Sequence, residues 1–386
     1  MIAETGFEIQ TIPRATFGAG AVGKLGRRVK SLGFERALLV TDAGLEKAGI
    51  VERVRGALEA GGVSADVFAK VEPNPRAPTV EEGARALRKL EGAAVISLGG
   101  GSCIDAAKAI ALLGPNEGTV RDFPFGCKPE QPGATVICVP TTAGTGSETN
   151  MFGVVTDPEI GRKVLVAHQS VLPALVVLDP ELTLGLPKSV TAQSGMDALV
   201  HAIEAFTSSR SNPFSEGIAL RAIAMVASYL PVAVDAGKDL EARSQMLVAA
   251  HLAGIAFSSA GLGICHAMGH PISARLDAAH GQTLAALLPH VMRFNRDVCE
   301  RKYAEVAIAL GAAELGKSDA DNAGRAIDAV QALSAQVGTD KSVAELGVTR
   351  ELLPTLVDDA LADLLMTTTP KYPSAEQVKE LYEAAL

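Results

Sequence analysis

Ala93–Ala109, with the sequence AAVISLGGGSCIDAAKA, is the stretch that decides the predicted fold. Its first six residues form a continuous apolar run, which is typical of a strand buried inside a parallel sheet. The glycine turn Gly99–Ser102 follows, and Ile104–Ala109 then begins a helix. Glycine lets the backbone approach a pyrophosphate closely, and the positive end of the next helix attracts negative charge. The unit therefore indicates a phosphate-binding loop, although a tight turn without a ligand is the alternative for so short a motif.

Short apolar runs of the same kind recur through the first half of the chain. They alternate with helical stretches such as Val80–Leu90, which indicates a parallel sheet covered by helices on both faces. Residues 64–68 form a weaker strand, because Ser64 and Asp66 interrupt the apolar pattern and suit a position nearer the sheet edge. The predicted strands are residues 37–41, 64–68, 93–98, 135–139 and 175–178, with residues 152–156 and 163–167 as an antiparallel pair.

The pattern changes after Asp179-Pro180, where β-branched runs give way to long helical stretches rich in alanine and leucine. Gly185 and Pro187 mark the joint, because both residue types stop regular secondary structure. The chain has 386 residues, 48% of them hydrophobic, and is long enough for two domains with separate cores. We therefore expect an α/β domain over residues 1–184 and an all-helical domain over residues 185–386.

Composition excludes several classes of protein. A formal net charge of −9 without a long Lys/Arg tract removes the electrostatic basis for binding nucleic acid. The uncharged residues 249–274 could span a bilayer by length, but their histidines, serines and glycines fit a buried helix–loop segment beside a polar site, so no membrane is expected. Five scattered cysteines without a CxxC pair, and no signal peptide, indicate the reducing cytoplasm. The expected partner is a small molecule.

A second glycine loop, Pro140–Glu148 (PTTAGTGSE), follows the strand at residues 135–139 and favours a nucleotide. Asp42 directly follows the strand at residues 37–41, where its carboxylate could accept hydrogen bonds from a ribose 2′-hydroxyl and would repel a 2′-phosphate. This position favours NAD over NADP. Because Asp42 precedes the glycines, the order differs from the Rossmann fingerprint and predicts another doubly wound arrangement. The alternative is that Asp42 only caps a helix at residues 43–48.

Carboxylate and imidazole side chains gather on a helix predicted over Gly195–Phe206 (GMDALVHAIEAF). Asp197 and His201 are four residues apart and share one face of that helix. Such a pair is more often an ordinary intrahelical contact than a metal site. Glu204 continues the same stripe and could be a metal ligand, an acceptor for a ligand, or neither.

A second cluster places His266, His270 and His280 within a stretch of fifteen residues that is otherwise mostly apolar. Each buried imidazole needs a partner, and one cation shared with a carboxylate satisfies several at once; separate backbone carbonyls are the alternative. One carboxylate with imidazole nitrogens and no thiolate suits a first-row divalent ion and leaves room for a substrate oxygen. Spacing does not choose among the three histidines, although the interval of four favours pairing His266 with His270.

Taken together, these motifs resemble those of the iron-containing, or group III, alcohol dehydrogenases over essentially the full length of the chain. The resemblance implies an N-terminal α/β dinucleotide-binding domain and an all-helical C-terminal domain, the dehydroquinate synthase-like architecture, with metal and nicotinamide meeting between them. It also implies a homodimer. The matching stretches are SLGGGSCIDAAKAIAL, VPTTAGTGSE, SGMDALVHAIEAF, GLGICHAMGH and AHGQTLAALLPHVMRFN.

Carried over by position, the resemblance implies a set of metal ligands that replaces the pairing of His266 with His270. His270 becomes a catalytic residue beside the substrate, as a proton relay or an orienting group. The sequence departs from the family pattern at Ser194, Pro271–Ser273 and Thr369–Lys371. The resemblance therefore does not determine the pocket near these residues. The implied metal ligands are Asp197, His201, His266 and His280; the implied dinucleotide contacts are Asp42, Asn74, Gly99, Gly100, Ser102, Thr141, Thr142 and Lys163; and Phe152 and Phe257 are implied in the pocket wall.

The predicted activity is hydride transfer between NAD(H) and a small primary alcohol or aldehyde. A divalent metal, Fe(II) or alternatively Zn(II), would polarise the substrate oxygen. A lyase of the dehydroquinate synthase type is the alternative, because it resembles this architecture and also uses NAD and a metal. The two differ in net cofactor turnover, since a synthase regenerates its NAD in each cycle. A metal- or nucleotide-binding regulator without chemistry is a third class and would give no absorbance change with any alcohol.

Overall fold

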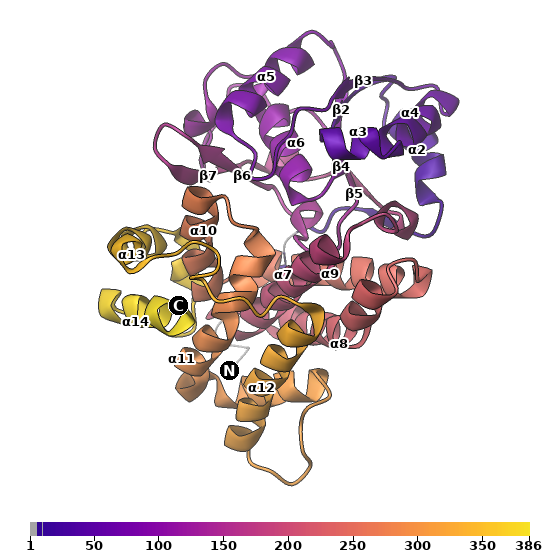
Figure 1. Cartoon of the computed structure of the whole chain (residues 1–386). Coiled ribbons are helices and arrows are strands. Elements are labelled where there is room, and N and C mark those ends of the chain that lie inside the picture. Colours follow the sequence, from indigo (N-terminus) through magenta and orange to yellow (C-terminus); the bar gives the residue numbers. More distant parts are fainter. Residues whose placement is uncertain (1–5, 10) are drawn as a thin grey trace. The chain divides into compact units, whose positions relative to one another are not determined.

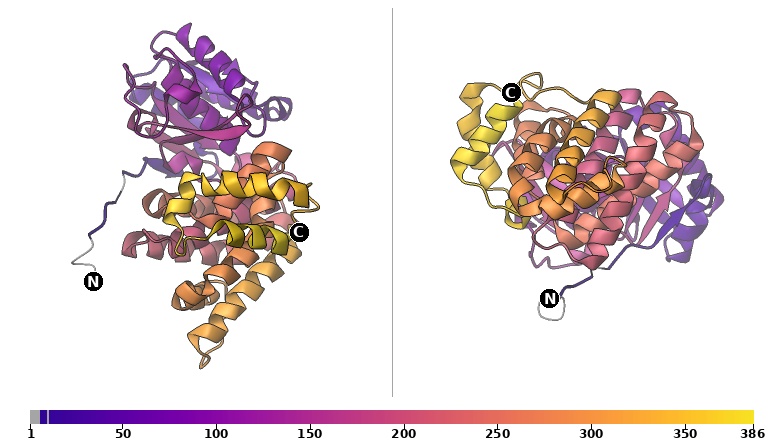
Figure 2. Two further views of the ribbon diagram at one scale, coloured as in Figure 1. Left: turned by 90° about the vertical axis from the view of Figure 1, so that its left-hand side faces the viewer. Right: turned by 90° about the horizontal axis from the view of Figure 1, so that it is seen from below.

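The computed structural model describes residues 6–9 and 11–386, and the chain divides into two compact units. The α/β unit comprises Ile12–Thr142 and Ser147–Gly185. The helical unit is built mainly from Leu186–Leu386 and includes the short loop Ala143–Gly146. In Figures 1 and 2 the α/β unit runs from indigo to magenta and the helical unit from magenta through orange to yellow. The predicted domain limits, 1–184 and 185–386, stay a prediction.

Within the described residues, the α/β unit contains a six-stranded parallel sheet and a separate antiparallel pair, β6 and β7. The sheet order is β1-β8-β5-β4-β2-β3, so the polar-interrupted strand β3 lies at an edge, as its sequence predicted. The sequence did not predict β1, which is only three residues long and pairs with β8. The strands are β1 (Ala15–Phe17), β2 (Arg36–Val40), β3 (Ser64–Phe68), β4 (Ala94–Gly99), β5 (Val136–Pro140), β6 (Phe152–Asp157), β7 (Arg162–Ala167) and β8 (Leu175–Leu178).

Helices cover both faces of the parallel sheet because successive strand side chains point to opposite faces. Leu39, Ile96 and Val139 face the helices α2 and α4, and they belong to one core cluster with residues of those helices. On the other face, α5 and α6 pack against the sheet, and α6 is buried over most of its length. The helices of this unit are η1 (Ala21–Lys24), α2 (Leu25–Ser31), α3 (Ala43–Lys47), α4 (Ile50–Ala60), α5 (Ala77–Arg88), α6 (Gly101–Leu113), η2 (Val120–Asp122), η3 (Ser147–Thr149), η4 (Gln169–Val171) and η5 (Pro180–Thr183).

The helical unit is organised around α7, which packs against α8, α9 and α11 (Figure 1). The chain turns through 109° between α9 and α10, so residues 249–274, predicted as a helix–loop segment, comprise the end of one helix, a short loop and most of the next helix. α10 then packs against α11 and α13. The helices are α7 (Lys188–Thr207), α8 (Pro213–Asp235), α9 (Leu240–Ala260), α10 (Ile264–Leu276), α11 (His280–Ala309), α12 (Asp319–Val337), η6 (Arg350–Leu352), α13 (Leu353–Leu361), η7 (Leu364–Thr368) and α14 (Ala375–Ala385).

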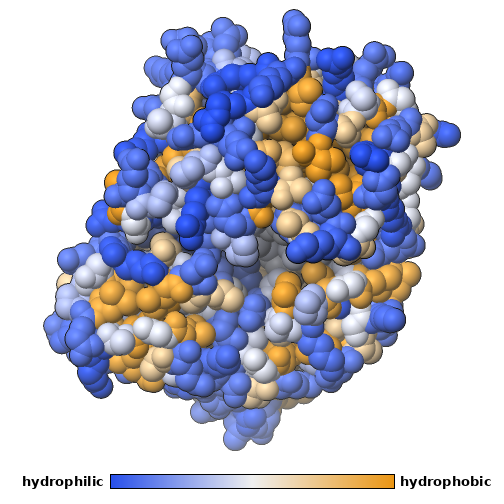
Figure 3. Space-filling view, turned by 45° about the horizontal axis from the view of Figure 1, so that its top comes forward, coloured by the Kyte–Doolittle hydropathy of each residue, from blue (hydrophilic) through white to orange (hydrophobic). Residues whose placement is uncertain are grey.

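By length and composition alone, α8 could cross a membrane, as could α9 and α10 taken as one bent span. In the fold, α8 lies along both α7 and α9, so packing within the helical unit accounts for many of its apolar side chains. Figure 3 shows hydrophilic side chains over most of the face drawn, with smaller groups of hydrophobic side chains between them.

Candidate functional site

One face of α7 carries three ionisable side chains that the sequence singled out. Asp197, His201 and Glu204 follow each other at intervals of four and three residues, so they lie on one side of the helix. All three are buried, with 3%, 5% and 5% of their surfaces exposed. Buried charged groups occur where they are paired or bind a metal, so this face needs partners from other elements.

The partner element is α10, which brings His266 to the same place. Its Nε2 lies 3.8 Å from Asp197 Oδ1, and His201 Nδ1 lies 3.5 Å from the same oxygen. The His201 and His266 rings stack with their centroids 4.5 Å apart. Two ligands of one ion cannot be farther apart than the sum of their bond lengths, about 4.2 Å for nitrogen and oxygen ligands. Both distances therefore fit a shared cation.

Two buried imidazole nitrogens in this cluster also call for a ligand. His201 Nδ1 and His266 Nε2 have no hydrogen-bond partner among the residues that the structure describes. Leaving a buried polar atom unsatisfied costs about 1–3 kcal/mol. One divalent cation beside Asp197 would satisfy both nitrogens and neutralise the carboxylate. The donor set of carboxylate and imidazole thus fits a first-row divalent metal.

His280 begins α11 and approaches the cluster from a third direction. Its Nε2 lies 4.0 Å from Asp197 Oδ1, and its Nδ1 lies 3.5 Å from Ser273 Oγ. Across the described part of the chain, the group whose candidate ligand atoms all lie within 4.8 Å of one another consists of Asp197, His201 and His266. His280 lies at the margin of that group, so its role as the fourth ligand stays a prediction.

The start of α11 is held against α7 by a close backbone approach. A Cβ atom on Gly281 would lie 2.1 Å from the carbonyl oxygen of Gln193 and 3.3 Å from Asp197 Cβ. Only glycine fits there without moving one of the two helices. The residue after His280 thus sets the distance between His280 and the helix that carries Asp197.

Glu204 acts on the cluster through His266. Its Oε2 accepts a hydrogen bond from His266 Nδ1 at 2.6 Å, and its Oε1 accepts one from the Cys265 backbone N–H at 2.7 Å. Glu204 therefore caps the beginning of α10 and fixes His266 with Nδ1 protonated, which leaves Nε2 for a metal. Of the three roles left open by the sequence, the structure favours that of an acceptor for a ligand.

Burial and charge shift the pKa values of the two stacked histidines in opposite directions. Burial lowers the pKa of His201 to about 4, although the carboxylate of Asp197 opposes this shift. Burial also disfavours the charged form of His266, but the carboxylates of Asp197 and Glu204 outweigh it and raise its pKa to about 9. Without a metal, His201 is therefore neutral and His266 carries a proton at neutral pH.

His270, the predicted catalytic residue, lies beside the cluster. Its ring stacks on that of His280 at 5.4 Å between centroids and meets the His266 ring edge-on at 6.1 Å. Its Nδ1 lies 2.7 Å from Asp363 Oδ2. Asp363 was not predicted from the sequence, because it is 93 residues away along the chain.

The glycine loops of the α/β unit have the geometry expected of a phosphate site. Gly99 ends β4 with φ of +153°, and a Cβ atom there would lie 2.4 Å from Cys103 Sγ. α6 starts directly afterwards, so its first amides face the loop. Thr142 packs against Gly100, at 3.0 Å from the position of a Cβ atom. The loops after β4 and β5 are therefore in contact, while the Thr141 side chain is buried.

Asp42 is a helix cap in the structure. Its Oδ1 accepts hydrogen bonds from the backbone N–H groups of Gly44 and Leu45, at 2.8 and 2.9 Å. Its Oδ2 accepts one from Cys103 Sγ at 3.6 Å. The cap predicted as an alternative is present, and because a carboxylate has about four lone-pair sites, the cap leaves acceptor capacity for a ribose hydroxyl.

Asn74 and Lys163 lie on segments that both pair with Thr156 of β6. Asn74 has φ of +52°, a left-handed conformation that is uncommon outside glycine. The next residue, Pro75, accepts a hydrogen bond from the Thr156 backbone N–H at 2.7 Å, and Thr156 is the strand partner of Lys163. The two predicted dinucleotide contacts thus belong to one local arrangement, and their role in binding stays a prediction.

A buried lysine supports the second glycine loop. Lys108, on α6, donates hydrogen bonds to the Ser147 carbonyl, Ser147 Oγ, Asn150 Oδ1 and the Phe152 carbonyl, at 2.5 to 3.0 Å. Asp105 accepts a hydrogen bond from Ser147 Oγ at 2.5 Å. Burial lowers the pKa of Lys108 and raises that of Asp105. This network was not predicted, although a lysine inside the apolar helix IDAAKAIAL is a sequence signal for it.

Two family models together match most of the chain. The model described as "Iron-containing alcohol dehydrogenase" matches residues 13–180. The model described as "Fe-containing alcohol dehydrogenase family, C-terminal" matches residues 191–386. The chain belongs to the iron-containing alcohol dehydrogenase family. The predicted family and enzyme class, an alcohol dehydrogenase acting on CH–OH groups, are thereby confirmed. The predicted fold class is confirmed by the parallel sheet, the helical unit and the similarity to solved structures.

Relatives and solved structures that are named as dehydrogenases or oxidoreductases match nearly the whole chain. The "Probable alcohol dehydrogenase EutG" of Salmonella typhimurium is 39% identical over 97% of this chain and 94% of its own length. The "NAD-dependent methanol dehydrogenase" of Bacillus methanolicus is 35% identical over 97% of this chain and 98% of its own. A crystal structure of 1,3-propanediol oxidoreductase superimposes with a TM-score of 0.95 at 35% identity, covering 98% of this chain and 100% of that one.

The two predicted pocket-wall residues, Phe152 and Phe257, have different neighbours in this alcohol dehydrogenase. Phe257 stacks on His201 with centroids 4.7 Å apart, so it lies against the candidate metal ligands. Phe152 contacts Phe125 in the α/β unit, where its part in a pocket stays a prediction. Ser194, which departs from the common family residue, donates its hydroxyl to the Val190 carbonyl at 2.7 Å within its own helix.

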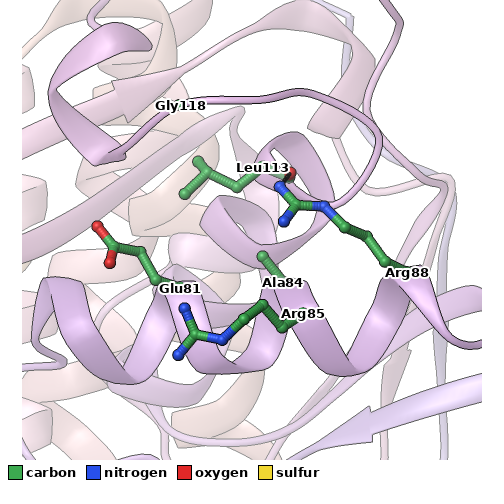
Figure 4. A pocket seen from close by; sticks show the side chains of 6 residues that line it. All are labelled: Glu81, Ala84, Arg85, Arg88, Leu113 and Gly118. Carbon is green, nitrogen blue, oxygen red and sulfur yellow. Dashed lines mark hydrogen bonds between the residues drawn. The ribbon is translucent and has the colours of Figure 1, made fainter.

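A small cavity between α5 and the end of α6 does not match any predicted site (Figure 4). Its volume is about 60 Å³, well below the roughly 300–1,000 Å³ of ligand pockets. Arg88 donates to the carbonyls of Leu113, Gly114 and Asn116, so its guanidinium is used to cap α6. The cavity is lined by Glu81, Ala84, Arg85, Arg88, Leu113 and Gly118.

Proposed function

We propose that this family member transfers a hydride between NAD(H) and a small primary alcohol or aldehyde, using one divalent metal ion held by Asp197, His201, His266 and His280. The observation that carries the proposal is the buried cluster of Asp197, His201 and His266, whose ligand atoms all lie within 4.8 Å of one another. When bound, the metal supplies Lewis-acid polarisation of the substrate oxygen, and the nicotinamide supplies the hydride acceptor or donor.

The residues of the chain bind, orient and shield the reacting groups. Glu204 holds the ligand His266 in the tautomer that leaves Nε2 for the metal. Phe257 covers one face of His201 and keeps water from that side. We assign His270 to the substrate side, where its imidazole would accept or return the hydroxyl proton or orient the substrate.

The pyrophosphate of the dinucleotide would bind at Gly99, Gly100 and Ser102, at the start of α6. Asp42 would bind the ribose, and its carboxylate favours NAD over NADP because a 2′-phosphate would be repelled. The name of the Bacillus methanolicus relative, which specifies NAD, supports this choice. The other proposed contacts with the dinucleotide are Thr141, Thr142, Asn74 and Lys163.

Iron is the proposed metal because the family is named for it, and zinc is the alternative because nitrogen and oxygen sites bind zinc more tightly than ferrous iron. We also propose that the protein forms a homodimer and is located in the cytoplasm. The location is supported by the five cysteines, which are free thiols in the described part of the chain.

The test is a panel of small alcohols and aldehydes with metal-loaded protein, followed by nicotinamide absorbance. We expect NADH to accumulate with alcohols and NADH to be consumed with aldehydes, with NADP(H) giving lower rates. Net turnover also separates the proposal from the synthase alternative, which returns its NAD to the starting state. Absence of net NADH formation with every alcohol and NAD⁺, in protein shown to contain the metal, would contradict the proposal.

A further inference from the structure

His270 is held by a carboxylate from a distant part of the helical unit. Asp363 lies between α13 and η7, while His270 lies on α10, and α10 packs against both of those elements. His270 Nδ1 is 2.7 Å from Asp363 Oδ2, and about one sixth of each side chain is exposed, 16% and 18%. Charge-assisted hydrogen bonds of this length in a partly buried site are among the stronger ones in proteins.

Both oxygens of Asp363 have a defined donor. Oδ2 faces His270, and Oδ1 accepts the Leu365 backbone N–H at 2.9 Å as the cap of η7. Burial works against ionisation of Asp363, but its interactions with the His270 ring and the Leu365 N–H outweigh burial and lower its pKa. Asp363 is therefore a carboxylate that can only accept hydrogen bonds.

An acceptor at Nδ1 decides the tautomer of the histidine. Because the Asp363 carboxylate cannot donate, the hydrogen between the two groups belongs to His270 Nδ1. In the neutral imidazole the lone pair is then on Nε2. His270 therefore offers an acceptor at Nε2 and keeps its ring stacked on His280.

The segment that carries Asp363 is itself tied to the helices around the metal cluster. Thr368 Oγ1 donates to the Leu262 carbonyl at 2.6 Å, just before α10 begins. The Thr368 carbonyl accepts hydrogen bonds from Ser208 Oγ at 3.1 Å and from the Ser209 backbone N–H at 3.0 Å, just after α7 ends. These bonds fix the residues after Asp363 against the end of α7 and the beginning of α10, two of the three helices that carry proposed ligands.

We propose that Asp363 is a positioning residue for the alcohol dehydrogenase reaction: it holds the ring of His270 and fixes the Nδ1–H tautomer, so that Nε2 is the atom available to accept a proton or hydrogen bond from the substrate hydroxyl. The inference rests on the proposed function of His270. Asp363 acts only through His270.

The decisive variant is Asp363→Asn. An amide has one acceptor oxygen, so it cannot accept from both Leu365 N–H and His270 Nδ1–H as the carboxylate does. If its NH₂ group faces His270, the imidazole must switch to the Nε2–H tautomer. We expect kcat to fall by roughly 10–100-fold, the range for loss of a group that orients a site residue, with a smaller change in KM and with metal content and NAD affinity retained. Asp363→Glu, which restores a carboxylate, should recover part of kcat.

Asp359→Asn is the matched control. Asp359 lies on α13 and binds Arg275 of α10 at 2.7 Å, so its loss removes a bond between the same two helices and leaves the Asp363 carboxylate in place. We expect kcat of this variant to stay within about twofold of wild type, because the Asp359–Arg275 pair includes no predicted site residue, while loss of the partly buried pair lowers the stability.

A second readout reports the tautomer directly. In zinc-loaded protein, the ring ¹⁵N shifts of His270 should be those of the Nδ1–H form in the wild type and should move toward the Nε2–H form in Asp363→Asn. Unchanged kcat and unchanged ring shifts in Asp363→Asn would overturn the inference, as would an equal loss of kcat in Asp363→Asn and Asp359→Asn. If the wild-type protein oxidises no alcohol, the proposed function fails, while the ring shifts still decide whether Asp363 fixes His270.

Discussion

At the scale of single residues, Glu204 both caps α10 and holds the His266 ring, and the sequence did not predict which role it has. One oxygen caps α10 at Cys265 and the other holds His266 Nδ1, so each carboxylate oxygen has a separate partner. The spacing of Glu204 from Asp197 and His201 predicted that it shares their face of α7. Whether it binds the metal or a ligand depends on α10, which is some sixty residues farther along the chain.

Glu204→Gln should weaken metal binding without unfolding the protein. Glutamine has one acceptor oxygen for two donors, so either the cap of α10 or the His266 tautomer is lost. We expect the metal Kd to rise by about 10–100-fold, measured by competition with a chelating dye. The control is Glu216→Gln on α8, where Glu216 pairs with Lys302 at 2.9 Å and the metal Kd should not change. Equal Kd values for the two variants would rule out this role of Glu204.

The residue scale also shows where prediction from sequence stops. The interval between Asp197 and His201 and the crowding of His266, His270 and His280 predicted a cluster, and three of these side chains form a compact group. Asp363 could not be found this way, because it lies 93 residues from His270 and nothing local distinguishes it from a helix cap. Contacts between distant segments depend on how α10 and α13 pack, and periodicity does not specify this.

At the scale of elements, the contact between α7 and α11 positions the fourth predicted ligand. Gly281 lets the two helices approach until a Cβ atom would overlap the Gln193 carbonyl. Helix packing at this distance is set by backbone and not by long side chains, so it can change only by moving one helix.

Gly281→Ala should therefore displace His280 and loosen the site. The methyl group would force α11 away from α7, and overpacking of this kind costs about 1–3 kcal/mol. We expect a lower free energy of unfolding and a weaker metal affinity, measured by urea denaturation and by dye competition. Gly217→Ala is the control, because a Cβ at that position on α8 meets nothing within 4 Å. That variant should be neutral or stabilised by up to about 1 kcal/mol, since alanine favours helix. Unchanged metal affinity and stability in Gly281→Ala would contradict the close approach.

The elements themselves were predicted well where the pattern was strong. Buried strands such as β4 and β5 are continuous apolar runs, and the weak pattern of β3 indicated its place at the edge. β1 escaped prediction because three residues with mostly exposed side chains carry no period. It exists as a strand through its pairing with β8, far away in the sequence.

At the scale of the whole molecule, protons and the metal compete for the same imidazole. His266, with a pKa of about 9, is protonated at neutral pH in metal-free protein, whereas His201, with a pKa of about 4, is not. Because a ligating imidazole must be neutral, the proposed metal binding at about pH 7.5 should release about one proton per chain. Calorimetric zinc titrations in two buffers of different ionisation enthalpy measure this number. Release of no proton would contradict the charged state of His266.

The same two groups contribute in opposite directions to how the stability of metal-free protein depends on pH. The raised pKa of His266 adds stability that is full below the ordinary value of 6.5 and is lost as the pH rises through about 9. The lowered pKa of His201 adds stability that is full above 6.5 and is lost as the pH falls toward about 4. Urea denaturation across this range should show stability falling in both directions from near pH 6.5. A stability that rises steadily from pH 6.5 to 9 would contradict the assignment for His266.

The most direct test of the central claim is a titration of metal-stripped protein with Zn²⁺ or Fe²⁺, in which bound metal and alcohol-dependent NADH formation are measured on the same samples. We predict that activity rises in proportion to bound metal and reaches its plateau at one ion per chain. His201→Ala should bind NAD normally but lose both the ion and the activity. Full activity in stripped protein, or in His201→Ala without bound metal, would contradict the claim that this cluster holds the catalytic ion.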